Sequence, residues 1–72
     1  MKIWIEAEMS GVLAAVSAVS GAIVQEGDSV GEIECMKSFW PIVSPSSGIL
    51  TWLISLGDMI GQDQIIATVE KE

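Results

Sequence analysis

The sequence predicts an all-β fold, either a flattened barrel or a two-sheet sandwich, built from two similar halves with approximate two-fold symmetry. Short runs of alternating apolar and polar residues are separated by glycine, proline and serine, which is typical of strands joined by turns. No stretch keeps a helical period over several turns. The second half of the chain also repeats the glycine and aliphatic spacing of the first, and each half is too short to bury its own apolar face.

The first half begins with two expected strands. Residues 2–8 alternate, because Ile3, Ile5 and Ala7 share one face and mostly polar side chains share the other. The run at residues 12–19 is rich in valine and alanine, and its β-branched side chains favour extended structure over helix. Both runs are therefore predicted to be strands.

The midpoint of the chain is predicted to be a tight hairpin. Two strand-like runs, residues 29–34 and 39–44, flank it, and the chain reverses at Met36 and Lys37. Pro41 has no N–H to donate, which confines the outgoing strand to a sheet edge or a bulge. Two-residue hairpins prefer asparagine and glycine, because their central residues need positive φ. Met36 and Lys37 therefore carry strain, which indicates that the turn serves to hold the Lys37 amine in water, within reach of an enzyme.

The second half supplies the remaining elements. Strands are expected at residues 49–56 and 65–70, and turns at residues 27–28, 46–48 and 57–58. These elements complete the repeat, in which residues 21–34 lie over residues 57–70 and, with one residue inserted in the first copy, Gly11 lies over Gly48. The central hairpin joins the two copies, so we expect Lys37 at one pole of the domain and the termini at the other.

Composition excludes several kinds of function. A chain of 72 residues is expected to form a single domain, residues 1–72, that buries only about 60% of the surface of its unfolded chain. It has no histidine or arginine, only three lysines and one cysteine. This inventory excludes a zinc site, a Ser-His-Asp triad and a Cys-His pair. Without histidine, the chain is not expected to be an enzyme in its own right.

Charge and hydrophobic patterning bear on partners and compartment. The formal net charge of −7 argues against nucleic acid and anionic membrane surfaces as partners. The uncharged residues 9–25 follow Glu6 and Glu8, where a signal peptide would carry lysine or arginine. Prolines interrupt the uncharged residues 38–57, so they are not expected to span a membrane. With a lone cysteine and no signal, the expected localisation is cytoplasmic.

The central hairpin resembles a known signature. Glu34-Cys35-Met36-Lys37-Ser38 is similar to the Glu-Ala-Met-Lys-Met motif of biotinyl/lipoyl attachment domains of the biotin type. Ile42 and Ser47-Gly48 also fit that pattern, as do residues 27–30 upstream. The resemblance covers about residues 9–70 and is greatest to a thumbless biotin carboxyl carrier.

The resemblance implies a fold, a cofactor and partners. The fold is the hammerhead type, two similar four-strand halves with pseudo-two-fold symmetry. A biotin protein ligase would join biotin to Lys37, with Glu34, Cys35, Met36 and Ser38 as the flanking motif. Biotin would then shuttle an activated carboxyl group between the biotin carboxylase and carboxyltransferase subunits of a carboxylase or decarboxylase.

Three residues depart from the family pattern. Cys35 replaces the usual alanine, which preserves a small apolar side chain. Ser38 replaces the second methionine, which we expect to lower the efficiency of modification. Glu32 occupies a strand position that is usually aliphatic, and it aligns with Thr68 in the repeat. We expect both halves to leave that position in contact with water.

Two other functions remain open at this point. The chain could be a lipoyl domain of a 2-oxo acid dehydrogenase-type complex, although Met36 and Ser38 favour biotin because lipoyl signatures have aspartate and alanine there. It could also be an unmodified interaction module of the same fold. Phe39 and Trp40 could form a ligase or carboxylase contact, but we expect at least one of them to pack in the core.

Overall fold

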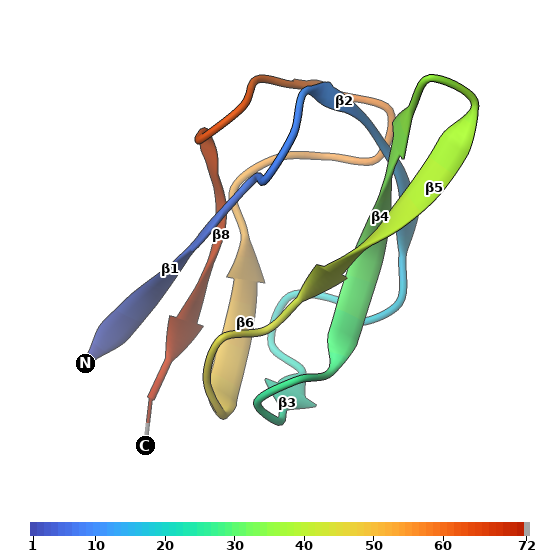
Figure 1. Ribbon diagram of the computed structural model, residues 1–72. Coiled ribbons are helices and arrows are strands. Elements are labelled where there is room, and N and C mark those ends of the chain that lie inside the picture. The colour runs from blue at the N-terminus through green and yellow to red at the C-terminus, as the bar shows by residue number, and fades with distance from the viewer. Residues whose placement is uncertain (72) are drawn as a thin grey trace.

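Two antiparallel β-sheets of four strands each form the fold (Figure 1). This computed structural model describes residues 1–71, and within that range no helix is long and apolar enough to cross a bilayer. The strands, in chain order, are β1 (Lys2–Glu6), β2 (Gly11–Val16), β3 (Ile23–Val24), β4 (Ser29–Cys35), β5 (Ser38–Val43), β6 (Gly48–Trp52), β7 (Met59–Ile60) and β8 (Ile65–Glu70).

The strand orders confirm the predicted two-fold symmetry. One sheet runs β1-β8-β6-β3 and the other runs β5-β4-β2-β7. The two orders are equivalent when each strand is replaced by its counterpart in the other half. The counterparts are β1 and β5, β2 and β6, β3 and β7, and β4 and β8. Each sheet therefore contains strands from both halves, so neither half forms a sheet alone. The sheets pack as a sandwich, whose edge strands are β1 and β3 in one sheet and β5 and β7 in the other.

Backbone hydrogen bonds repeat between the halves. The N–H of Gly21 donates to the carbonyl of Leu50 at 2.8 Å, and the N–H of Gly57 donates to the carbonyl of Leu13 at 2.8 Å. Gly21 and Gly57 have φ values of 93° and 91°, a region in which a side chain is strained. The backbone takes the same left-handed conformation at both positions, and this conformation favours glycine. This explains why both copies of the repeat have glycine there.

The core lies between the two sheets and contains side chains from both. Leu13 of β2 and Leu50 of β6, which are equivalent in the repeat, are 1% and 0% exposed. Along β1, Ile5 is buried whereas Trp4 and Glu6 are exposed, as its alternation predicted. The buried hydrophobic cluster consists of Ile5, Ala7, Leu13, Val24, Val30, Ile33, Ile42, Leu50, Ile60, Ile66, Ala67 and Val69.

Several strand boundaries differ from those predicted. Strand β6 ends at Trp52 rather than at residue 56. Beyond it the chain turns, and a carboxylate oxygen of Asp58 accepts a hydrogen bond of 2.8 Å from the N–H of Ser55. Strands β1 and β2 end at Glu6 and Val16, before residues 8 and 19. Strands β3 and β7 were not predicted, because two residues are too few to show a period.

Thr68 corrects the prediction that both halves leave its position in contact with water. It is 5% exposed, whereas its counterpart Glu32 is half-buried. In the register of the sheet, Thr68 lies between Trp4 of β1 and Thr51 of β6. It therefore occupies an inner strand with a neighbour on each side, one of them an indole, and this position is shielded from water.

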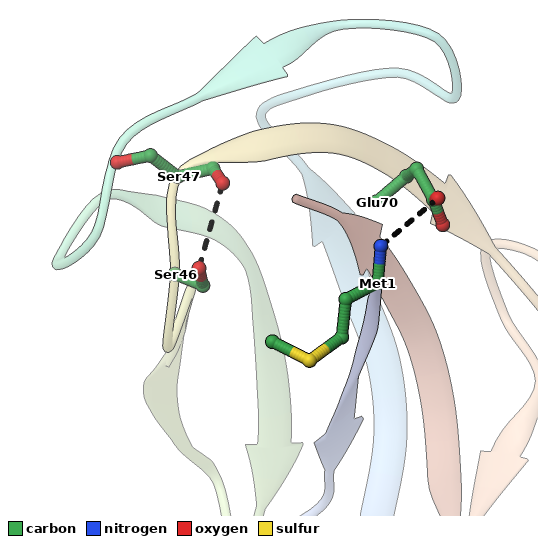
Figure 2. Close-up of polar contacts among 4 residues, drawn as sticks. All are labelled: Met1, Ser46, Ser47 and Glu70. Carbon is green, nitrogen blue, oxygen red and sulfur yellow. Dashed lines mark hydrogen bonds and ion pairs between the residues drawn. The ribbon is translucent and has the colours of Figure 1, made fainter. Parts of the chain in front are cut away.

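The start of β1 and the end of β8 lie side by side at one pole, and the β4–β5 hairpin lies at the other (Figure 1). The N–H of Lys71 donates to the carbonyl of Met1 at 2.8 Å, and Lys2 pairs with Glu70 in the sheet. The amino group of Met1 lies 3.3 Å from a carboxylate oxygen of Glu70 (Figure 2). The molecule measures 36 × 19 × 19 Å, so these poles are the ends of its long axis. The predicted placement is confirmed.

Candidate functional site

The site is built by the hairpin that joins β4 to β5. Cys35 and Ser38 form its last register pair, which leaves Met36 and Lys37 as a two-residue loop. Both loop residues lie in the left-handed region, with φ of 52° and 65°, as hairpins of this length require. The predicted turn is confirmed. The strain of a left-handed residue with a side chain is about 1–2 kcal/mol each, and the long β4–β5 ladder holds the turn in place.

The side chains of the turn lie in solvent. Met36 is 93% exposed, and Lys37 is also exposed. Among residues 1–71 the sole ion pair joins the amino group of Met1 to Glu70, at the opposite pole (Figure 2). The Lys37 amine therefore has no carboxylate partner within this part of the chain. An exposed amine at the tip of a hairpin is accessible to an external active site.

The other motif residues lie at the base of the turn. Glu34 and Ser38 are exposed, and Cys35 is a half-buried free cysteine. The backbone carbonyl of Glu34 lies against the α-carbon of Gly11, with no room for a side chain there. The structure thus brings the five predicted site residues together on one hairpin. Gly11 supports that hairpin from the neighbouring strand, a role that the motif alone did not reveal.

Phe39 and Trp40 are both largely exposed, at 57% and 47%. The prediction that at least one of them packs in the core is therefore wrong. Since β5 is an edge strand, no further strand lies beside Phe39 and Trp40, whereas Ile42 of the same strand is buried. Pro41 lies on this edge strand, as predicted.

A row of exposed and half-buried side chains crosses the outer face of the sheet next to the turn. Glu34 pairs with Phe39 on one side and with Val12 on the other, and Val12 pairs with Met59. Met59 is 84% exposed. We call Phe39, Glu34, Val12 and Met59 the outer row. It presents apolar side chains on both sides of one carboxylate, directly below Met36 and Lys37.

A groove opens between the edge strands β1 and β5. Its volume is about 230 Å³. Sequence reasoning missed this groove, because it brings together strands that are far apart in the chain. The signal that could have revealed it is the repeat, which makes β1 and β5 equivalent strands. The residues that line it are Ile5, Glu6, Ala7, Glu8, Met9, Ile33, Trp40, Pro41, Ile42 and Val43.

Serine side chains fasten the opposite pole. The hydroxyl of Ser44, which is 1% exposed, donates to the carbonyl of Ser46 at 2.7 Å. The hydroxyl of Ser46 donates to the carbonyl of Ser47 at 3.4 Å (Figure 2). The hydroxyl of Ser47 accepts a bond of 3.2 Å from the N–H of Glu26. The first two bonds lie within the turn after β5, and the third joins that turn to the turn before β4, so together they support the hairpin at the end remote from Lys37.

The chemistry available at the hairpin is narrow. Residues 1–71 contain no group of three or more His, Cys, Asp and Glu side chains arranged to hold a metal ion. A protonated lysine amine is a poor nucleophile, and no base lies in an ion pair with Lys37 within those residues. The arrangement can therefore present an amine for acylation by another protein, which must supply an activated acyl group.

Comparisons with known proteins agree with this geometry. The family described as "Biotin-requiring enzyme" matches residues 4–69. An acetyl-CoA carboxylase of Dictyostelium discoideum is 34% identical over 50 residues, which is 69% of this chain and 2% of that protein. The crystal structure of the urea carboxylase of Kluyveromyces lactis aligns with a TM-score of 0.89 and 27% identity, over 97% of this chain and 6% of that chain. The chain thus spans a small part of the length of each.

Proposed function

The chain belongs to the Biotin_lipoyl family of biotin-requiring enzymes, and we propose that it carries biotin as an amide on the side-chain amine of Lys37. The observation that carries this proposal is the place of Lys37 at the tip of a two-residue turn with left-handed φ. Glu34, Cys35, Met36 and Ser38 flank the attachment point. The relatives named above support biotin, since both are carboxylases.

The residues at the hairpin fit such a group. The turn fixes the backbone of Lys37, and the four-carbon stem of the lysine remains free to swing. Biotin, once attached, supplies a ureido group that takes up and releases a carboxyl group. Attachment raises the local concentration of that group at each active site that the hairpin can reach. This chain therefore contributes by presenting the attached group in solvent and by letting it reach partner active sites.

The proposed partners are a biotin protein ligase and the biotin carboxylase and carboxyltransferase components of a carboxylase. Each of them must approach Lys37, so each must lie close to the outer row. The apolar side chains of Phe39 and Met59 offer contact area there, and Glu34 offers a charge for a basic residue of the partner. The net charge of −7 would steer the domain towards partners of positive potential.

Intact-mass spectrometry of the protein produced in a biotin-replete host with a biotin protein ligase tests this function. We expect a mass increment of one biotinyl group and a positive streptavidin blot, both of which disappear in Lys37→Arg. The matched controls are Lys2→Arg and Lys71→Arg, which change the other two lysines and should leave the increment in place. Protein that stays unmodified in this host would contradict the proposal.

The second candidate is a lipoyl carrier, because a hairpin lysine of this geometry fits either group. A lipoyl-sized increment on Lys37 in the same spectrum would establish that function instead. The observation against it is Met36, which stands where lipoyl domains have aspartate. Separate reactions with a biotin protein ligase and with a lipoyl ligase would show directly which of the two groups is attached to Lys37 faster.

A further inference from the structure

The groove between β1 and β5 has an apolar floor and an aromatic wall. Ile5, Ile33 and Ile42 at its floor are 3–5% exposed, so they present apolar surface without leaving the core. Trp40 of β5 and Met9, which lies beyond the end of β1, also line the groove. A volume of about 230 Å³ is below the roughly 300–1,000 Å³ of sites for drug-sized ligands. The groove therefore suits a group of one or two small rings.

Polar groups for such a ligand are available along both walls. Strands β1 and β5 are the outermost strands of their sheets, and an edge strand leaves backbone N–H and C=O groups unpaired along one side. Glu6 and Glu8 add carboxylates to the lining, and none of the lining residues is a lysine. This lining favours a neutral group that donates N–H hydrogen bonds, and it disfavours an anionic group.

An added peptide strand is a poor occupant, although edge strands commonly recruit one. Pro41 lies in the middle of β5 and lacks the N–H that a new strand would need. Where β1 pairs with β8, the register shifts between Ile5 and Glu6, with the extra residue in β8, and such a bulge bends and twists the strand pair. The wall at β5 is therefore unsuited to continuous strand pairing, whereas a small ring needs only a few of these backbone groups.

The attachment point lies within reach of the groove. Trp40 is three residues beyond Lys37, which is about 10 Å along an extended strand. About eleven covalent bonds separate the lysine α-carbon from the rings of an attached biotin, and an extended chain of that length reaches roughly 12 Å. A biotinyl group on Lys37 can therefore place its rings beside the indole of Trp40 without any movement of the hairpin.

We propose that the β1–β5 groove is a resting site for the rings of a biotinyl group on Lys37, in which Trp40 stacks on the rings and the polar edges accept the ureido N–H groups. This inference rests on the proposed function. The site would shelter the neutral rings between visits to partner active sites. A lipoyl group has no N–H donor in its ring, so the same groove would hold it less well.

Nuclear magnetic resonance of the full chain, with and without biotin on Lys37, tests the site. The chain has three tryptophans, and each gives one indole N–H signal. We expect the Trp40 indole signal and the Met9 methyl signal to shift on biotinylation. The Trp4, Trp52 and Met59 signals should stay, because these residues do not line the groove. Lys37→Gln removes the lysine charge without adding rings, so it is the control for charge, and it should leave Met9 unshifted.

The outcomes separate the two proposals. Absence of the biotinyl increment overturns the proposed function and the resting site together. A biotinylated protein whose Trp40 and Met9 signals match those of the unmodified protein overturns the resting site alone. As a second readout, streptavidin should capture biotinylated Trp40→Ala several-fold faster than the biotinylated parent, and Trp4→Ala at the parental rate. Equal capture rates for the parent and Trp40→Ala would also overturn the resting site.

Discussion

The indole Nε1 of Trp52 donates a hydrogen bond of 2.7 Å to the backbone carbonyl of Ala18. The bond joins the end of β6, in the second half of the chain, to the segment that follows β2 in the first half. The backbone N–H of Trp52 also donates to the hydroxyl of Ser20 at 2.9 Å. Trp52 is therefore a direct link between the two halves, and it shields one end of the core.

Trp52→Phe should lower the free energy of unfolding by about 1–2 kcal/mol, because it removes the donor and leaves the Ala18 carbonyl without that partner. Urea denaturation followed by circular dichroism would measure the change. The matched control is Trp4→Phe, since Trp4 is 54% exposed and a surface change of this kind stays within about 0.5 kcal/mol. Equal losses in the two variants would show that the indole hydrogen bond contributes nothing.

Met36→Asn should raise the free energy of unfolding by about 1 kcal/mol, because asparagine adopts left-handed φ more readily than methionine. The φ of Met36 is 52°, and its side chain is in solvent, so the change alters backbone strain with little effect on packing. Met36→Ala keeps a β-carbon and should bring no such gain. A thermal melt of both variants would make the comparison, and equal midpoints would refute the assignment of strain to this residue.

Gly11→Ala should destabilise the fold by about 2–3 kcal/mol through overpacking. The added methyl would meet the carbonyl oxygen of Glu34 and lie 2.7 Å from a methyl of Ile33, so β4 would have to move. Gly57→Ala tests conformation alone, because φ is +91° and no described atom lies within 4 Å of the added carbon. We expect it to lose about 1 kcal/mol. Denaturant titration would rank the two, and a larger loss at Gly57 would contradict this explanation.

Ser38→Met should increase the initial rate of biotinylation by a biotin protein ligase several-fold, because it restores the side chain that the family signature has after the lysine. Ser38 is exposed, so the free energy of unfolding should change by less than about 0.5 kcal/mol. Cys35→Ala restores the other departure from the signature, yet the side chain is half-buried and should affect the rate little. A streptavidin gel-shift time course gives both rates. An unchanged rate in Ser38→Met would show that the ligase does not recognise the side chain at this position.

Local features of the site were predictable from sequence because they depend on neighbouring residues. Alternation on both sides of Met36 and Lys37 predicted the hairpin and its two-residue turn, and the repeat placed that turn opposite the termini. Pro41 predicted an edge strand for the same reason, since a missing N–H excludes an inner position. In each case the physical cause lies within a few residues of its effect.

Features that depend on distant pairing were not predictable in the same way. The repeat indicated two halves, but not that each sheet would combine strands from both. Consequently the exposure of Trp40 was misjudged, because it depends on what lies beyond β5, and the burial of Thr68 was missed, because it depends on strands β1 and β6. The β1–β5 groove is of this kind too, since no local pattern indicates which two edges face each other.

The hydrogen bond between Lys71 and Met1 has a practical consequence for fusion proteins. Because the N–H of Lys71 donates to the carbonyl of Met1, these two residues lie side by side. A polypeptide grafted onto either end, or a host protein into which the domain is spliced, would leave from the base of the molecule. A linker attached to Met1 or to Lys71 would therefore leave the surface around Lys37 accessible.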